Sequence, residues 1–386
     1  MLASFAYDDL GNRTSATFGN GVVQTFGRDP VSRLSSLSND LSGTANDLSA
    51  TFAYNPANQI TQTVRTGDAY AFTKIGAENT VYTENGLNQQ VTISKLAVGW
   101  DSKGNLTSDP TSGKTYGYSS ENLLTSAAGG VTLAYDPLKR LYQLSGASTT
   151  RFAYDGANAI AEYNGSNALQ RRFVFDPTTG DPVLWYEGTG TASTNRRYLS
   201  LDERGSVISV SGSTGASLGL NTYDEYGKPG AGNLGRYQYT GQKWIAEAGL
   251  YDYHFRDYVA HLGIFAQSDP IGQVDSPNLY AYVLDDPVNL VDPLGLYWLK
   301  RCVGVVGSEQ CDTIWIEDNT GWGNRDTSLT SPGERNGGAG DDDIVITGKR
   351  LKPSVGTKIL RCTLNQYGLS GLGAATGLIG TGQPIR

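Results

Sequence analysis

The 386-residue sequence predicts an all-β fold made of successive β-hairpins, and three observations support this prediction. The chain holds 23 Tyr and 10 Phe, which suit the pleated, half-buried surface of a sheet. Its 49 Gly suit tight turns. An aromatic–Asp unit, followed by a turn sequence and a short apolar stretch, recurs along residues 1–235. A β-sandwich with Tyr-rich strands is the alternative fold.

The recurring unit begins with an aromatic or apolar residue and a second aromatic two positions later, and it continues with Asp or a substitute. It starts at Phe5, Phe26, Phe52, Val98, Tyr116, Leu133 and Phe152. Its first and third residues point to the same face of a strand, because side chains alternate with a period of two. The Asp then closes a turn by accepting backbone N–H bonds, so we expect Asp136 and Asp155 to be turn formers rather than catalytic or calcium-binding groups.

These units resemble the YD repeats of Rhs proteins, of the C components of insecticidal toxin complexes and of teneurins. The resemblance covers residues 1–235. It implies a sheet of β-hairpins that spirals into a cocoon-like shell, because an isolated hairpin is marginal and neighbouring hairpins must stack to bury their aromatic side chains.

Residues 236–296, called the core segment below, follow the repeats. They contain two Asp-Pro-x-Gly motifs, Asp269–Gly272 and Asp292–Gly295, which lie on either side of the stretch Asn-Leu-Tyr-Ala-Tyr. This segment is similar to the Rhs repeat-associated core domain over its whole length. The resemblance implies that the core segment closes one end of the shell and, in many members, acts as an aspartyl autoprotease.

Carried over to this chain, the resemblance makes Asp269 and Asp292 the candidate catalytic carboxylates and Leu296–Tyr297 the scissile bond. Two carboxylates in close approach do not both ionise easily, so one serves as general base while the other donates a proton. Gly272 and Gly295 are expected to allow close backbone approach. Pro270 and Pro293 are expected to stiffen the two turns.

The chain departs from the family pattern next to this pair. Ile264 stands where the family usually has Arg, and Tyr258-Val-Ala replaces the usual Tyr-Ser-Pro or Tyr-Asp-Pro. Arg256 is retained and is expected to substitute in part for the missing guanidinium. The alternative interpretation is that both Asp-Pro-x-Gly motifs serve only as turns that close the shell.

The sequence predicts neither a cofactor nor a metal site. The two histidines, His254 and His261, have no ligand pattern beside them and are expected to be partly exposed strand or turn residues. The net charge of −8 gives no footprint for nucleic acid. No apolar run is long enough for a membrane span, and no signal peptide is visible.

Residues 297–386 have a different character, because the aromatic–Asp units stop. Short strands are expected around Trp315 and Val345, and residues 318–343 are predicted to be a linker or a disordered segment. Cys302, Cys311 and Cys362 all lie here, with a Cys302–Cys311 disulfide and free thiols as the two alternatives. The segment holds no His, zinc spacing or phosphate loop, so no reaction is assigned to it.

The leading functional hypothesis is a secreted or cell-surface shell that encloses residues 297–386 as an effector for bacterial competition and cuts itself after Leu296. The chain has the character of a fragment, or of one product of a longer system. The expected partners are therefore a companion shell subunit or secretion component and an immunity protein. The alternatives are a non-enzymatic surface protein that binds carbohydrate through its Tyr and Trp residues, and a degenerate fragment with neither role.

Overall fold

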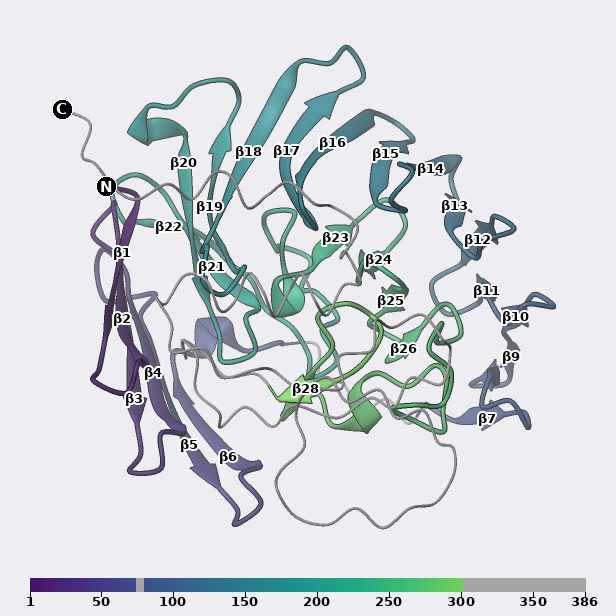
Figure 1. Ribbon diagram of the computed structural model, residues 1–386, viewed down its shortest axis with the longest axis horizontal. Helices are drawn as coiled ribbons and strands as arrows, with labels where there is room; N and C mark the ends of the chain where they lie inside the picture. Colours follow the sequence, from purple (N-terminus) through teal and green to yellow (C-terminus); the bar gives the residue numbers. More distant parts are fainter. Residues whose placement is uncertain (74–79, 301–386) are drawn as a thin grey trace, which may run out of the picture. The chain divides into compact units, whose positions relative to one another are not determined.

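The computed structural model describes residues 1–73 and 80–300, which all fall in one compact unit, Met1–Ile314. Every strand pair in these residues is antiparallel, and the strands follow one another in chain order along each sheet (Figure 1). The predicted all-β fold is confirmed. The strands expected around Trp315 and Val345, and all three cysteines, lie outside the described residues.

Two large sheets hold most of the strands. The six-stranded sheet consists of β1 (Ala3–Tyr7), β2 (Arg13–Phe18), β3 (Val23–Arg28), β4 (Leu34–Asp40), β5 (Leu48–Tyr54) and β6 (Ile60–Thr66). The thirteen-stranded sheet consists of β10 (Gly99–Trp100), β11 (Leu106–Asp109), β12 (Lys114–Tyr118), β13 (Leu124–Ala127), β14 (Val131–Tyr135), β15 (Leu141–Ser145), β16 (Thr149–Asp155), β17 (Asn158–Asn164), β18 (Leu169–Phe175), β19 (Pro182–Glu187), β20 (Arg196–Leu201), β21 (Val207–Ser211) and β22 (Ser217–Leu220).

Three small sheets complete the described part. They are β7 (Tyr82–Glu84), β8 (Gln90–Ile93) and β9 (Leu96–Ala97); β23 (Lys243–Ile245), β24 (Leu250–Asp252), β25 (Asp257–Val259) and β26 (Ile264–Phe265); and β27 (Leu290–Val291) with β28 (Leu299–Lys300). Four 3-10 turns lie among the described residues, η1 (Asp68–Tyr70), η2 (Ser193–Asn195), η3 (Tyr239–Gly241) and η4 (Val283–Asp285). None of the described helices is long and apolar enough to cross a membrane.

The predicted units form the expected hairpins, and most of them share one turn geometry. In the β14–β15 hairpin, Asp136 Oδ1 accepts the N–H groups of Leu138 and Arg140 at 2.9 and 3.0 Å. The third residue after Asp136, Lys139, has a positive φ of 62°. The same pattern, with a capping side chain followed three residues later by a positive φ, recurs after Asp8, Asp29, Asn55, Asn85, Asp101, Ser119, Asn164, Asp202 and Asp224.

The aromatic side chains explain how the hairpins stack. The hydroxyl groups of Tyr54, Tyr118 and Tyr154 donate to backbone carbonyls at the start of the preceding hairpin's return strand, at 2.8–2.9 Å. Each of these Tyr residues lies near the end of the first strand of its own hairpin, and the return strand carries one extra residue opposite it. Such bulges increase the local twist of a sheet, so the twist grows with each hairpin that is added.

Asp155 does not cap a turn, and the prediction for this residue is wrong. It ends β16 opposite Asn158 in a hairpin closed by only two residues, Gly156 and Ala157. In the part of the chain that the structure describes, no hydrogen bond to its exposed carboxylate is found. A two-residue hairpin closes through its own backbone and leaves no orphan N–H for a side chain to accept.

This difference between two Tyr-Asp units predicts different stability effects. We expect Asp136→Ala to lower the free energy of unfolding by about 1–2 kcal/mol, because two turn N–H groups and the Arg140 guanidinium lose their acceptor. Asp155→Ala is the matched control and is expected to stay within about 0.5 kcal/mol. Urea unfolding followed by Trp fluorescence measures both, and equal losses would contradict the capping role.

The core segment packs against both large sheets, as its green ribbon shows between their strands (Figure 1). One apolar cluster joins β11–β17 residues such as Leu124 and Leu141 to Ile245, Val259 and Ile264 of the core segment. The six-stranded sheet contacts it through Ile60 N–H, which donates to Asn289 Oδ1 at 2.6 Å. A separate cluster lies within the core segment and consists mainly of Tyr239, Tyr251, Tyr253, Tyr258, Phe265 and Tyr282, called the aromatic cluster below.

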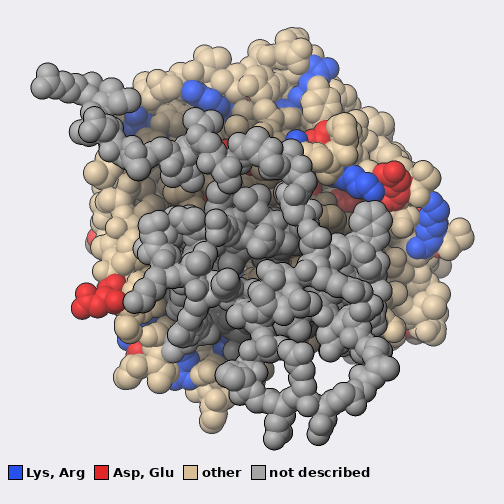
Figure 2. All heavy atoms as spheres, viewed as in Figure 1, with Lys and Arg blue, Asp and Glu red and all other residues tan. Residues whose placement is uncertain are grey.

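Charge is dispersed over the visible surface. On the part of the face in Figure 2 that is not covered by grey atoms, Lys and Arg lie scattered among Asp, Glu and uncharged residues. The sequence as a whole carries 30 basic and 38 acidic residues. The part of this face that is not grey therefore shows no broad basic patch of the kind that binds nucleic acid.

Candidate functional site

The two candidate aspartates converge on one guanidinium. Asp269 Oδ2 lies 2.7 Å from Arg256 Nη2, and Asp292 Oδ2 lies 3.4 Å from the same nitrogen. The three side chains are 2–3% exposed. The chain thus brings together two carboxylates that are 23 positions apart in the sequence, with a single cation between them.

Arg256 is fixed from several sides. Its Nε donates to Gly295 O at 2.6 Å, and its Nη1 donates to Leu279 O at 3.1 Å. The guanidinium carbon lies 3.7 Å from the centre of the Phe265 ring, which adds a cation–π contact. The planar fork of an arginine reaches both carbonyls and both carboxylates at once, which the single ammonium of lysine does not.

Each aspartate also caps its own turn, in the geometry of the repeat turns. Asp269 Oδ1 accepts Ile271 N–H at 2.9 Å. Asp292 Oδ1 accepts three N–H groups, from Leu294, Gly295 and Leu296, at 2.8–3.1 Å. Turn formation and pairing therefore use different oxygens of one carboxylate, so the turn-only interpretation and the paired-carboxylate interpretation do not exclude each other.

The two motif glycines play different parts. Gly295 has a φ of 69°, and a Cβ added there would lie 2.9 Å from Tyr253 O and 3.1 Å from Arg256 N. Its predicted close backbone approach is confirmed. Gly272 has a φ of 73°, but a Cβ there would meet nothing within 4 Å. The expectation of close approach is wrong for Gly272, whose requirement is the left-handed backbone alone.

Burial dominates the electrostatics of the pair. It raises the pKa of Asp269 to about 7 and the pKa of Asp292 to about 6, against the opposing attraction of Arg256. Three backbone N–H groups favour the ionised form of Asp292, whereas Asp269 has one. Between about pH 6 and 7 the pair therefore holds close to one proton, preferentially on Asp269.

The departure at Ile264 does not leave the pair without a cation. Ile264 is buried in the apolar cluster with Ile245 and Val259, while its neighbour Phe265 lies against Arg256. Residues next to each other in a strand face opposite sides, so the side chain at position 264 points away from the guanidinium. Arg256, which was expected to substitute only in part, is the residue that bridges the pair.

The backbone around the expected scissile bond is held on both sides. Leu296 N–H binds Asp292 Oδ1, so the residue that contributes the scissile carbonyl is tied to one candidate aspartate. After the bond, Leu299 and Lys300 form β28 and pair with β27. Trp298 Nε1 donates to Asp275 O at 3.3 Å. The sequence offered no signal for Asp275 and Trp298.

The histidines lie elsewhere, in turns, and both are partly exposed as expected. His261 Nε2 lies 2.6 Å from Asp109 Oδ2. His254 adopts a positive φ, and burial lowers its pKa to about 4. Among the described residues, no group of three or more His, Cys, Asp or Glu side chains is placed to hold a metal ion.

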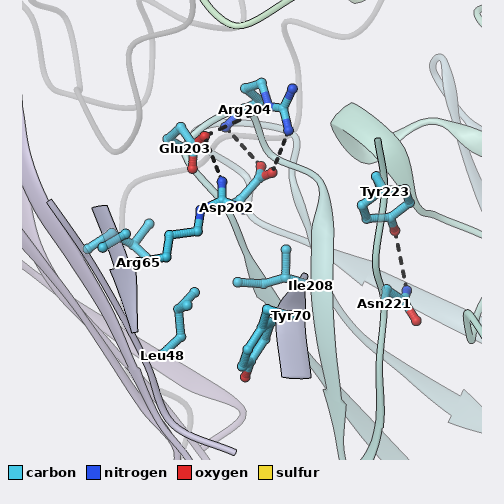
Figure 3. Close-up of a pocket in the computed structure, with 11 residues that line it drawn as sticks. Leu48, Arg65, Tyr70, Asp202, Glu203, Arg204, Ile208, Asn221 and Tyr223 are labelled. Atoms are coloured by element: carbon cyan, nitrogen blue, oxygen red, sulfur yellow. Dashed lines mark hydrogen bonds and ion pairs between the residues drawn. The ribbon is translucent and has the colours of Figure 1, made fainter. Parts of the chain in front are cut away.

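Two hollows lie apart from the aspartates. The first has a cavity volume of about 20 Å³, and Figure 3 shows it between Leu48 and Tyr70 on one side and the ion pairs of Arg204 on the other. That volume holds about one water molecule, so it is no substrate pocket. The second is an open groove of about 470 Å³, whose lining includes Trp244 and the charged residues Arg171, Arg236 and Glu247.

The chain was compared with known proteins, and part of its length is similar to bacterial proteins. No family model matches the chain. The chain is 28% identical to the tRNA nuclease WapA of Bacillus subtilis over 247 residues, which are 58% of this chain and 10% of that protein. It is 39% identical to the toxin protein Tse5 of Pseudomonas aeruginosa over 69 residues, which are 18% of this chain and 5% of that protein.

Among solved structures, the crystal structure of TcdB2-TccC3 is similar at 18% identity and a TM-score of 0.48, over 76% of this chain and 20% of that one. The chain therefore spans only a small part of the length of the proteins it matches. The series of capped hairpins and the core segment that packs against them, together with the similarity to WapA and Tse5, agree with the resemblance of the chain to Rhs/YD-repeat proteins.

Proposed function

We propose that residues 1–296 form part of a shell that encloses and delivers a C-terminal effector, residues 297–386, and that the core segment breaks the covalent link to this effector by cutting the Leu296–Tyr297 bond. The observation that carries the proposal is the convergence of Asp269 and Asp292 on Arg256, with Leu296 N–H bound to Asp292. The division into residues 1–235, 236–296 and 297–386 is part of the same proposal.

The relatives support the role in toxin delivery. WapA is named as a tRNA nuclease and Tse5 as a toxin protein. The matched region is a small fraction of each, so their activities belong to those proteins as wholes. By analogy, we propose that this chain acts outside the cell that makes it and that an immunity protein protects the producer from residues 297–386.

The chemistry follows from the protonation of the pair. Asp292 is ionised and held by three N–H groups. It takes a proton from a water molecule while the oxygen of that water attacks the Leu296 carbonyl carbon. Asp269, protonated, donates to the carbonyl oxygen and so stabilises the tetrahedral intermediate. As the C–N bond breaks, Asp292 gives the proton that it took from water to the departing nitrogen, and the former carbonyl oxygen returns its proton to Asp269. The products are a carboxyl group on Leu296 and an amine on Tyr297, and both aspartates regain their starting protonation states.

This assignment predicts a bell-shaped dependence of the cleavage rate on pH, with a maximum between about pH 6 and 7. Below the pKa of Asp292, about 6, the base is protonated, and above the pKa of Asp269, about 7, the acid is lost. Arg256 and Asp275 are the other charged groups that act on the pair. The rate is measured by mass spectrometry after cell-free synthesis of the chain at each pH.

Asp257→Asn is the control for this profile. Burial also raises the pKa of Asp257 to about 7, but its carboxylate binds Gln267 Nε2 at 2.6 Å rather than Arg256. We expect this variant to keep the bell shape and its maximum. A rate that is constant from pH 5 to 9 in the unaltered chain would contradict the assigned acid and base.

A further inference from the structure

The expected scissile bond lies inside the loop of a β-hairpin whose two strands are β27 and β28. Val291 pairs with Leu299 and Leu290 pairs with Lys300, so the strands meet directly before Asp292 and shortly after Tyr297. The loop between them contains the complete Asp292–Gly295 turn and the Leu296–Tyr297 bond. Cutting one loop bond of a hairpin leaves the hydrogen bonds between its strands in place.

The residues that follow the bond have further contacts outside the hairpin. The Trp298 ring packs against the aromatic cluster, and its indole N–H donates to Asp275 O at 3.3 Å. Lys300 Nζ donates to the carbonyl oxygen of Asn58, at the turn that connects β5 and β6. Residues 298–300 thus bind three separate parts of the shell: β27, the aromatic cluster and the six-stranded sheet.

We propose that residues 297–300 are a non-covalent anchor that holds the effector on the shell after the chain has been cut. This inference rests on the proposed cleavage site and adds to it a binding site for the new N-terminus, with Trp298 as the main anchoring side chain. Cleavage and release are then separate events, because release requires β28 to leave β27 and Trp298 to leave the aromatic cluster.

The test follows residues 297–386 by size-exclusion chromatography and mass spectrometry after cleavage of the full chain. In native buffer the fragment is expected to elute with residues 1–296 and to separate only in urea. In Trp298→Ala the cleaved fragment is expected to dissociate at least tenfold faster. Leu299→Pro serves as a second variant, because proline cannot donate to the β27–β28 ladder and leaves the aromatic cluster untouched.

Trp100→Ala is the matched control. Trp100 also donates its indole N–H to a backbone carbonyl, Gln90 O at 2.8 Å, and its ring contacts Tyr280 rather than the hairpin. We expect its fragment to be retained as in the unaltered chain. The anchor is refuted when the unaltered fragment separates in native buffer, or when Trp298→Ala and Leu299→Pro both retain it as tightly as Trp100→Ala does.

A second preparation separates this inference from the proposed function. In an Asp292→Asn chain, the recognition sequence of an added site-specific protease is placed between Leu296 and Tyr297, and the protease makes the nick. The anchor is supported when the nicked chain retains residues 297–386 and the same nicked chain with Trp298→Ala loses them. This result is informative even where no self-cleavage occurs. Self-cleavage without retention leaves the proposed function standing and overturns the anchor.

Discussion

Arg256→Ala is expected to lower the free energy of unfolding by about 3–5 kcal/mol, because removing one partner of a buried ion pair leaves uncompensated charge in the interior. Here two carboxylates lose their cation, and Gly295 O and Leu279 O lose their donors. Urea unfolding measures the change. The same variant is expected to abolish cleavage, since the positions of both aspartates depend on the guanidinium.

The size of this loss depends on pH. Both aspartates have pKa values raised by burial, to about 7 and about 6, so they are mostly neutral at pH 5 and mostly ionised at pH 8. Without Arg256 the ionised pair has no counter-charge, and the loss is therefore larger at pH 8 than at pH 5. Arg256→Lys keeps the charge and is expected to lose less. A loss below about 1 kcal/mol at pH 8, typical of an exposed ion pair, would contradict the buried bridge.

The second large effect is on the rate of cleavage. Asp269→Asn and Asp292→Asn are each expected to slow it by about 10²–10⁴-fold, the usual contribution of a general acid or base. Asparagine has nearly the same shape as aspartate and keeps one oxygen for the turn, so the fold is expected to persist in both variants. The fraction of cleaved chain is followed by mass spectrometry after cell-free synthesis.

Asp275→Asn is the control for these variants. Asp275 acts on Arg256 and Asp269 through its charge, but among the hydrogen bonds and ion pairs of the described residues its carboxylate is not bound to either. We expect its cleavage rate to stay within about tenfold of that of the unaltered chain. Equal slowing in Asp275→Asn and Asp292→Asn would mean that the rate reports only the net charge of the site.

Much of the fold could be predicted from the sequence because the repeat unit is local. The aromatic pair, the capping residue and the return strand lie within about a dozen residues, so hairpins such as β5–β6 and β14–β15 appear in the sequence itself. The hairpin at Asn85 was missed, because Glu84 stands where the pattern has its second aromatic residue. The hairpin at Asn164 was also missed, although Tyr163 precedes it. Their turns still follow the shared geometry.

The candidate pair could be named from its motifs, but its geometry could not. Asp269 and Asp292 meet because β25, β26 and two turns bring distant parts of the core segment together, and no local pattern encodes that contact. The same reason explains why the role of Arg256 was underestimated and why Trp298 was missed. Each acts through a partner more than 20 positions away, Asp292 for Arg256 and Asp275 for Trp298.

The most direct test of self-cleavage by Asp269 and Asp292 is the intact mass of the purified chain, measured without denaturing steps that favour chemical cleavage. Self-cleavage by this pair predicts two products from the unaltered sequence, one ending at Leu296 and one beginning at Tyr297, and a single full-length mass for Asp292→Asn. A single full-length mass from the unaltered chain at pH 6–7, or the same two products from Asp292→Asn, would contradict self-cleavage by this pair.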